Sequence, residues 1–322
     1  MAAVRKMPAM RAGLALREMP TVRIGLALGH ADAVVEEARA AESAGFDLIS
    51  SGEHLFFHGP APNAFVHLAA AAGATNSIGL VSSITLLPLY PAPLAAKLAS
   101  AVDRVSGGRF ELGVGAGGEF AAEFEAAGVG LASRFRRLDE GLQVMRLLFS
   151  GKRVSFDGEF TTMRDVMLEP PPVQPGGPPI WLGGRKEGAM RRAGRLADVW
   201  MPYMVDPSRL RDSLGRVRET AAGAGREPAD ISGAVFVWAC VDADEQWARR
   251  TGIEAVSRAY AQDFAPLADR YLVLGAPGQV AARLHEFAEA GAASILLQLA
   301  CSQDARPRVI DQLAAEVLPL LR

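Results

Sequence analysis

From residue 22 onward, short runs of apolar residues alternate with longer segments in which apolar residues recur every three or four positions. Runs that are apolar throughout are typical of parallel strands covered on both faces, and the longer segments are typical of the helices that connect such strands. The segment 135–149 shows the helical period most clearly. The runs predict eight strands, at residues 22–28, 46–50, 78–87, 109–114, 179–184, 197–202, 231–241 and 293–300.

Two segments in the middle of the chain do not follow this alternation. Residues 152–163 place the pair Asp157-Gly158 between two alternating stretches, which predicts a β-hairpin, and residues 169–179 are rich in proline and glycine, which predicts an extended loop. Both are interpreted as insertions. We therefore predict an α/β fold in which residues 20–322 form a single (β/α)8 TIM barrel with insertion segments.

Residues 1–19 differ from the rest because basic residues lie among small apolar ones. No long apolar stretch or small-residue cleavage site follows, so this segment does not have the pattern of a targeting signal. We expect a flexible N-terminal extension that precedes an internal start at Met19.

The composition argues against several classes of protein. Lys and Arg number 34 and Asp and Glu number 36, so the formal net charge is −2 and the basic surplus of a nucleic-acid-binding protein is missing. No stretch reaches the roughly 18 consecutive apolar residues of a membrane helix. The only cysteines, Cys240 and Cys301, cannot form a disulfide framework and have no metal-ligand spacing. We therefore expect a cytoplasmic protein with no metal, membrane or nucleic-acid partner.

In a (β/α)8 barrel the reactive groups lie where the strands end, so the residues just after each apolar run are the candidates for chemistry. His54 follows the second predicted strand and could donate or accept a proton there. The alternative is a loop histidine that bonds only to the backbone. We interpret the neighbouring Glu53 as a structural carboxylate, and His30, after the first strand, could also line this end of the barrel.

After the fourth predicted strand, Gly113, Gly115 and Gly118 satisfy the pattern GxGxxG of dinucleotide-binding proteins. We discount a dinucleotide site, because the motif lies in the fourth βα unit and several glutamates follow it where a pyrophosphate would bind. These glycines allow a flat ligand or a phosphate to approach the backbone, or they only form a tight turn. The glutamates are Glu119, Glu123 and Glu125.

After the fifth predicted strand, Gly183 and Gly184 precede Arg185 and Lys186 at the start of a helix. Free backbone N–H groups and two cations predict an anion site, and a solvated basic turn is the alternative. After the sixth strand, two apolar side chains and one tyrosine hydroxyl could form a wall of the site, although the tryptophan among them is expected by default to pack in the core. These residues are Trp200, Met201 and Tyr203.

Four segments, at residues 51–56, 103–120, 134–151 and 178–200, together resemble the bacterial-luciferase-like superfamily of flavin- and coenzyme F420-dependent oxidoreductases. The resemblance runs from residue 22 to the C-terminus. It implies a flavin or deazaflavin in the C-terminal mouth of the barrel, with His54 against its reactive face. It also implies a non-prolyl cis peptide bond at Ser83-Ile84 that supports the ring system. The residues that it assigns to the cofactor are Ser83, Ile84, Gly115, Ala116 and Gly117 near the ring, and Gly183, Gly184, Arg185, Met201 and Tyr203 near the phosphate.

The resemblance favours an F420-dependent oxidoreductase that transfers a hydride to or from a small organic substrate. Arg185, Lys186 and one of Arg134, Arg136 or Arg137 could then meet the phosphate and acidic tail of F420. An FMN-dependent monooxygenase is the alternative. A non-catalytic flavin-binding barrel is less favoured, and an NAD-dependent dehydrogenase least of all. The resemblance also implies a homodimer.

The sequence departs from certain F420-dependent sugar-phosphate dehydrogenases of this superfamily, which have a catalytic glutamate where this chain has Gly118. The adjacent Glu119 does not take the same position in the sequence, so that reaction is in doubt here. Several aromatic residues could line an apolar substrate space or pack in the core. They are Phe56, Phe57, Tyr90, Trp200 and Tyr203.

Overall fold

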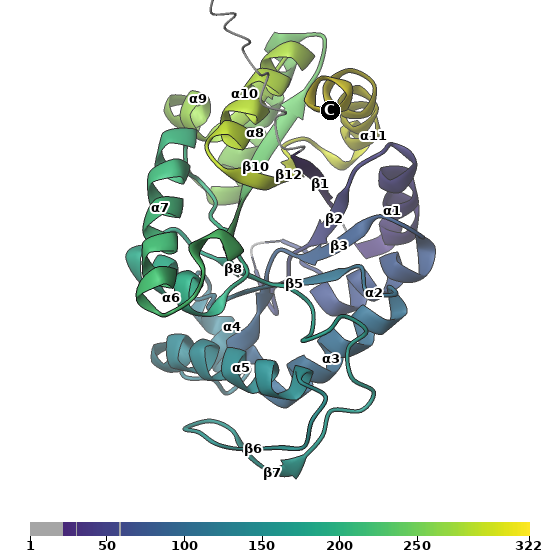
Figure 1. Ribbon diagram of the computed structural model, residues 1–322. Coiled ribbons are helices and arrows are strands. Elements are labelled where there is room, and N and C mark those ends of the chain that lie inside the picture. Colours follow the sequence, from purple (N-terminus) through teal and green to yellow (C-terminus); the bar gives the residue numbers. More distant parts are fainter. Residues whose placement is uncertain (1–21, 30, 58) are drawn as a thin grey trace, which may run out of the picture.

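The structure is a computed structural model that describes residues 22–29, 31–57 and 59–322, so the predicted extension at residues 1–19 and His30 lie outside the described residues. Eight parallel strands form a closed barrel, which confirms the predicted fold (Figure 1). The last strand pairs with the first and closes the ring. In order around the barrel the strands are β1 (Arg23–Ala27), β2 (Leu48–Ser51), β3 (Gly79–Ser82), β5 (Phe110–Gly115), β8 (Ile180–Gly183), β9 (Val199–Met201), β10 (Ser232–Val241) and β12 (Ala292–Leu299).

Helices surround the barrel and bury one apolar stripe each against it (Figure 1). The stripe predicted for residues 135–149 is confirmed, because Leu138, Leu142 and Met145 of α5 are buried. Polar side chains cap several helices at the N-terminus; Asn63 accepts from the Val66 N–H at 3.1 Å at the start of α2. The outer helices are α1 (Val34–Ser43), α2 (Ala64–Ala74), α3 (Ala92–Val105), α5 (Arg134–Phe149), α6 (Glu187–Leu196), α7 (Pro207–Gly223), α10 (Pro277–Glu289) and α11 (Arg306–Gln312).

The third predicted strand, at residues 78–87, is divided into two parts by a cis peptide bond between Ser83 and Ile84. The first part, β3, pairs with β2 and with the start of β5. The second part, β4 (Thr85–Leu86), pairs with the end of β5 at Val114 and Gly115. The chain therefore forms a bulge at the C-terminal end of the barrel, beside the last residues of β5.

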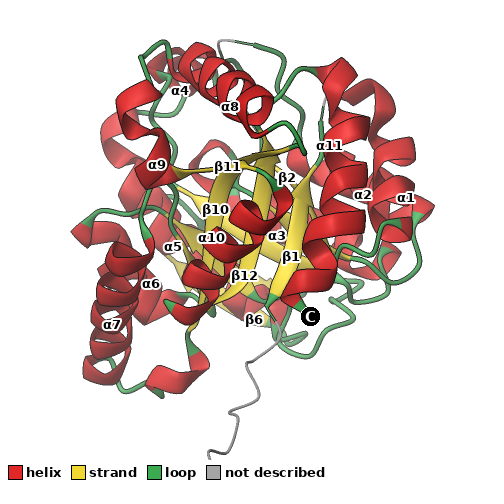
Figure 2. Ribbon diagram, turned by 90° about the horizontal axis from the view of Figure 1, so that it is seen from above, coloured by secondary structure: helices red, strands yellow, loops and turns green. Residues whose placement is uncertain are grey.

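One strand was not predicted. Strand β11 (Leu272–Gly275) pairs with residues 238–241 of β10, on the side where β9 pairs with the beginning of β10. Its four residues are too few to show a period, so the sequence predicts only helices in this region. Together with α8 (Glu245–Tyr260) and the short α9 (Ala268–Tyr271), β11 forms an addition to the barrel. Figure 2 shows α8 at the same end of the barrel as α4 (Ala121–Ala126), which follows β5.

The two predicted insertions are confirmed in structure. Strands β6 (Val154–Asp157) and β7 (Thr162–Val166) form an antiparallel hairpin, and residues 169–179 contain no helix or strand. The hairpin connection is longer than the Asp157-Gly158 pair alone, because Gly158 N–H donates to Thr161 O at 2.9 Å. In the described part of the chain, no helix is long and apolar enough to cross a membrane.

Side chains fill the interior of the barrel at its N-terminal half. Near the bottom, Glu111 accepts from Arg23 Nη1 at 2.6 Å and from Trp181 Nε1 at 2.7 Å. Above these lies a buried apolar cluster, against which Ile84 and Phe236 pack. A ligand site is therefore expected at the C-terminal end of the barrel. The cluster consists of Leu48, Val81, Trp181, Val199, Met201, Ala234 and Leu296.

Candidate active site

His54 lies in the segment that follows β2, at the C-terminal end of the barrel, and its side chain is 23% exposed. Its Nδ1 atom is 3.2 Å from Oε2 and 3.3 Å from Oε1 of Glu123. The ring of Phe57 stacks on the imidazole with a centroid distance of 4.1 Å and an interplanar angle of 15°. The partner of His54 is thus a carboxylate rather than the backbone, which was the alternative interpretation.

Glu123 comes from α4 and is fully buried. Besides its contact with the imidazole, its Oε2 atom accepts from the Leu55 N–H at 3.1 Å. The sequence placed Glu123 only among acidic residues that follow the glycine-rich turn. A helix of six residues shows no readable period, and 69 positions separate His54 from Glu123, so no signal in the sequence indicated this pair.

Glu53 is a structural carboxylate, as we interpreted it from the sequence. It is buried and accepts hydrogen bonds from Ala64 N–H at 3.1 Å, from Leu86 N–H at 2.9 Å and from Tyr90 Oη at 3.0 Å. Burial raises the pKa of Glu53 against the effect of these donors. Tyr90 also accepts a bond from Asn63 at 2.6 Å and is thereby part of this internal network.

The cis peptide bond that the resemblance implied at Ser83-Ile84 is present. The Ile84 side chain extends to glycines of two neighbouring strands. A Cβ atom added to Gly115 would lie 2.0 Å from Ile84 Cδ1, and one added to Gly183 would lie 3.2 Å from the same atom. Gly115 therefore has to be glycine because Ile84 occupies the space that a side chain would need.

Small residues form one wall of the C-terminal mouth. Leu48 belongs to the interior cluster, and a Cβ on Gly25 would touch Leu296 of that cluster. Because side chains alternate along a strand, Ser50 and Ala27, two positions further, face the same interior. Gly115 continues this wall on β5. This part of the mouth is therefore lined by small residues, with Ile84 packed against Gly115.

Buried hydroxyl groups at this end have no hydrogen-bond partner within the described part of the chain. They include Ser50 Oγ and Ser83 Oγ. A buried hydroxyl without a partner is costly, and such groups normally bond to a ligand or an ordered water. These two atoms are therefore suited to the polar edge of a bound ring.

The residues predicted for a phosphate form a different set of contacts. Arg185 Nη1 donates to Met204 O at 2.9 Å, and the guanidinium lies over the Tyr203 ring at 5.1 Å from its centroid. Tyr203 Oη in turn donates to Glu119 Oε1 at 2.8 Å. Burial, together with the charge of Glu119, raises the pKa of Tyr203. The structure thus brings Arg185 and Tyr203 together and joins them to Glu119.

Two other residues predicted for this region are buried. Met201 belongs to the interior cluster and Trp200 is fully buried, which confirms core packing as the default for this indole. Trp200 Nε1 donates to Gly184 O at 2.9 Å and so holds the turn after β8. Gly184 has a φ of +114°, which favours glycine at that position.

Of the three candidate arginines on α5, only Arg134 lies beside the glycine-rich turn. A Cβ on Gly118 would come within 2.8 Å of Arg134 Nε. Arg136 instead pairs with Glu159, and Arg137 Nε donates to Ser133 Oγ at 3.2 Å. Lys186 is exposed at the start of α6.

Aromatic residues that the sequence did not indicate meet where α8 packs near the end of β10. Trp238 lies two positions after Phe236, which packs on the interior cluster, and contacts Tyr260 edge-to-face at 6.2 Å between centroids. Tyr260 also lies 5.3 Å from Phe264. Trp238 belongs to β10, Tyr260 is the last residue of α8 and Phe264 follows that helix, so these aromatic residues meet only in the folded protein.

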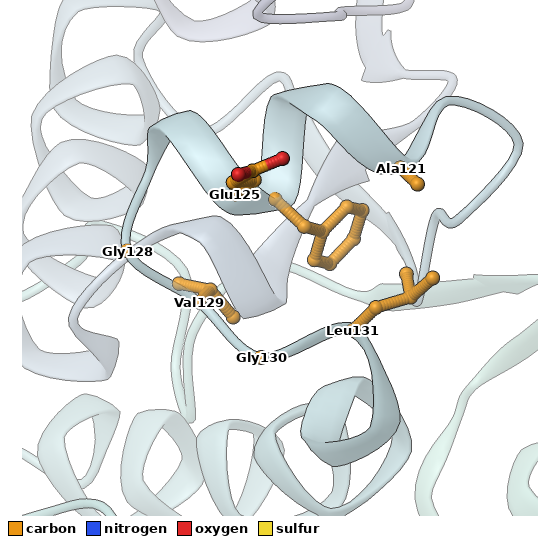
Figure 3. A pocket seen from close by; sticks show the side chains of 7 residues that line it. Ala121, Glu125, Gly128, Val129, Gly130 and Leu131 are labelled. Carbon is orange, nitrogen blue, oxygen red and sulfur yellow. The ribbon is translucent and has the colours of Figure 1, made fainter.

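A hollow of about 410 Å³ lies between α4 and residues 128–131 (Figure 3). Its walls are mainly apolar, with Phe124 and Leu131 beside the exposed Glu125. It contains none of the residues that the sequence predicts for the site. In the described residues, no group of His, Cys, Asp or Glu side chains could hold a metal ion.

Together with the family and the relatives described next, the fold defines a (β/α)8-barrel oxidoreductase. The chain belongs to the luciferase-like monooxygenase family, whose sequence model matches residues 10–294.

Proteins similar to this chain include F420-dependent dehydrogenases and a monooxygenase. An F420-dependent glucose-6-phosphate dehydrogenase of Intrasporangium calvum is 27% identical over 318 residues, 90% of this chain and 94% of the relative. A monooxygenase from Streptomyces bottropensis has a similar structure, with a TM-score of 0.81 and 24% identity over 92% of this chain and 99% of the other. An F420-dependent secondary alcohol dehydrogenase, solved with an F420–acetone adduct, has a TM-score of 0.80 and 24% identity over 94% and 99%.

Proposed function

We propose that this protein is an F420-dependent oxidoreductase that transfers a hydride to or from a small organic substrate bound at the C-terminal mouth of the barrel. The observation that carries the proposal is an imidazole held by a buried carboxylate next to the Ser83-Ile84 bulge. A Cβ on Gly52 would lie 3.0 Å from Ser83 O, and His54 follows two residues later. The name of the Intrasporangium calvum relative, which aligns with nine-tenths of this chain, supports F420 as the cofactor.

The residues of the mouth fit a deazaflavin. The wall of small residues would accept a flat ring, and Ile84 would support this ring from below. Ser50 and Ser83 offer buried hydroxyl groups to the polar edge of the ring. When bound, F420 supplies the hydride acceptor or donor. Ser83, Ile84, Gly115, Ala116 and Gly117 would hold its ring, and Gly183, Gly184, Arg185 and Tyr203 would lie toward its phosphate.

The side chains of the protein itself bind and orient the substrate and transfer a proton. His54 is placed to hold the substrate oxygen and to exchange a proton with it at the ring nitrogen not bonded to Glu123. Phe57 and Phe120, whose rings meet edge-to-face at 6.5 Å between centroids, cover this region and help to exclude water.

A sugar phosphate is not the substrate that this geometry favours. Gly118 offers no acid where related dehydrogenases have a glutamate, and Arg134 Nε occupies the space beside it. Glu119 does not replace that acid, since its carboxylate accepts the Tyr203 hydroxyl.

An FMN-dependent monooxygenase is the second candidate, and one observation favours it. Glu119 places a carboxylate in the network of Tyr203 and Arg185, with its Oε1 atom 2.8 Å from the Tyr203 hydroxyl oxygen. A negative charge here opposes the polyanionic tail of F420 more than the single phosphate of FMN.

Binding of the two cofactors separates these candidates. Purified full-length protein is titrated separately with F420 and with FMN, and binding is followed by fluorescence and by calorimetry. We expect saturable binding of F420 and weaker binding of FMN. Tight FMN binding without measurable F420 binding would contradict the proposed function and support the monooxygenase.

A further inference from the structure

We propose that Glu123 is a positioning residue that holds His54 in the tautomer with its proton on Nδ1. The Nε2 atom of His54 then faces the substrate as the proton acceptor. The inference rests on the proposed function for its catalytic meaning, although the tautomer itself can be measured without cofactor or substrate.

The contacts of Glu123 determine which atom donates. An ionised carboxylate can only accept hydrogen bonds, so a bond to His54 at 3.2 Å requires a proton on Nδ1. The same oxygen accepts from the Leu55 N–H at 3.1 Å, which fixes the carboxylate relative to the segment that carries His54. A carboxylate that is fully buried needs such partners, because burial without them is strongly unfavourable.

The short helix α4 presents this carboxylate and little else to the barrel. Glu123 and Phe124 are its buried residues, whereas Ala121, Ala122 and Glu125 are exposed. Phe57 stacks on the imidazole and restrains the plane of the ring. With Nδ1 bonded to Glu123 and one face covered, Nε2 is the ring nitrogen left for a ligand.

This arrangement gives Nε2 a defined role in hydride transfer. When a substrate alcohol is oxidised, its C–H bond would break and oxidised F420, the cofactor of the proposed function, would accept the hydride. The O–H bond breaks as well, the proton moves to Nε2, and a carbonyl forms. Glu123 stabilises the imidazolium that results, and reduction of a carbonyl follows the same steps in reverse.

The tautomer is measured by ¹⁵N NMR of the imidazole rings in the full-length protein without cofactor. Spectra of His54→Asn identify the signals of His54. We expect a protonated Nδ1 and an unprotonated Nε2 in the wild type. In Glu123→Gln the side-chain amide can donate to Nδ1, so the proton should move to Nε2. The matched control is Glu125→Gln, which removes the same charge from an exposed position of the same helix and should change neither signal.

Turnover provides the second measurement. We expect Glu123→Gln to lower kcat by about 10- to 100-fold, as is usual for the loss of an orienting partner, with a much smaller change in KM. A wild-type spectrum with the proton on Nε2 would overturn the inference, and so would a Glu123→Gln spectrum unchanged from the wild type. If Glu123→Gln does not fold, the wild-type spectrum decides alone. Failure of the proposed function would show as absent F420 binding while the Nδ1 tautomer persists.

Discussion

At the scale of single residues, the contacts of His54 explain why a histidine of intermediate exposure can act on a ligand. Glu123 and Phe57 occupy one nitrogen and one face of its ring, so the side chain is held in a single orientation. An oriented group loses little freedom when it binds substrate, which is the condition for efficient proton transfer. The same reasoning separates His54 from His285, which bonds to the Leu320 carbonyl at 2.9 Å on the outside of the barrel.

We expect His54→Ala to lower turnover by about 100-fold or more, because general acid–base groups typically contribute that much. Cofactor affinity should change less than about threefold, since backbone and small residues form most of the ring site. Steady-state kinetics and cofactor titration measure the two effects, with His285→Ala as the control. Unchanged turnover on an identified substrate would remove His54 from the reaction.

We expect Arg185→Ala to weaken F420 binding, because the guanidinium is the charged group closest to Tyr203 on the turn after β8. The loss of one charge-assisted contact corresponds to about 10-fold in affinity. Isothermal titration gives the two dissociation constants. The control is Arg195→Ala, an exposed arginine on the helix α6 that follows this turn. Equal affinity of Arg185→Ala and wild type would place the anion elsewhere.

At the scale of elements, the bulge between β3 and β4 depends on the glycines of β5 and β8. Ile84 packs where Gly115 has no side chain, so the two positions form one packing unit from different strands. The sequence pattern indicated that these glycines allow a close approach. In the folded protein, the Ile84 side chain is the group that lies close to Gly115. No local pattern could reveal this contact, because the two residues are about 30 positions apart along the chain.

We expect Gly115→Ala to destabilise the protein by about 1–3 kcal/mol, because the new Cβ overlaps Ile84. Urea denaturation measures the free energy of unfolding. Gly188→Ala is the control, since an added Cβ there meets no atom within 4 Å. The second substitution Ile84→Val should restore part of the loss in Gly115→Ala, and a stability equal to wild type for Gly115→Ala alone would argue against this packing.

Glu42 links α1 to the turn before β3 and makes this link sensitive to acid. Its desolvation is outweighed by bonds from the backbone N–H groups of Ser77, Ile78 and Asn76, so its pKa falls to about 2. A carboxyl whose pKa is lower in the folded state stabilises the protein above its unfolded pKa of about 4.3 and loses that contribution as pH falls through about 2. We expect stability to decrease between pH 5 and pH 2, and Glu42→Gln to flatten this decrease. Urea denaturation at several pH values in that range measures the free energy of unfolding of both proteins. An equal decrease in the wild type and in Glu42→Gln would contradict this role of Glu42.

At the scale of the whole molecule, closure of the barrel depends on its last strand. Strand β12 pairs with β1 on one side and with β10 on the other, and its residues are mostly buried. Without it, two buried strands would expose unpaired edges and the interior cluster would lose Leu296. The homodimer that the resemblance implies stays a prediction that light scattering can test.

We expect a chain truncated after residue 291 to show no cooperative unfolding transition, because both neighbours of β12 lose their partner. Circular dichroism during heating measures this. The matched control removes residues 1–19 instead, and there we expect an unchanged transition and unchanged F420 binding, as the predicted domain boundary requires. Loss of the transition in this control would show that the domain begins earlier.

The sequence by itself determined the barrel, because eight apolar runs and the periodic helices between them are local patterns that only a covered parallel sheet can satisfy. It also indicated the positions of His54 and of the turns after β5 and β8, since each follows directly from where a strand ends, whereas the Ser83-Ile84 bond was implied only by the resemblance to the family. Only the tertiary structure decided that Glu123 bonds to His54, that Glu119 accepts a hydrogen bond from the Tyr203 hydroxyl and that β11 joins the sheet. These contacts join residues far apart in the chain, and no periodicity encodes which distant side chains meet once the barrel has closed.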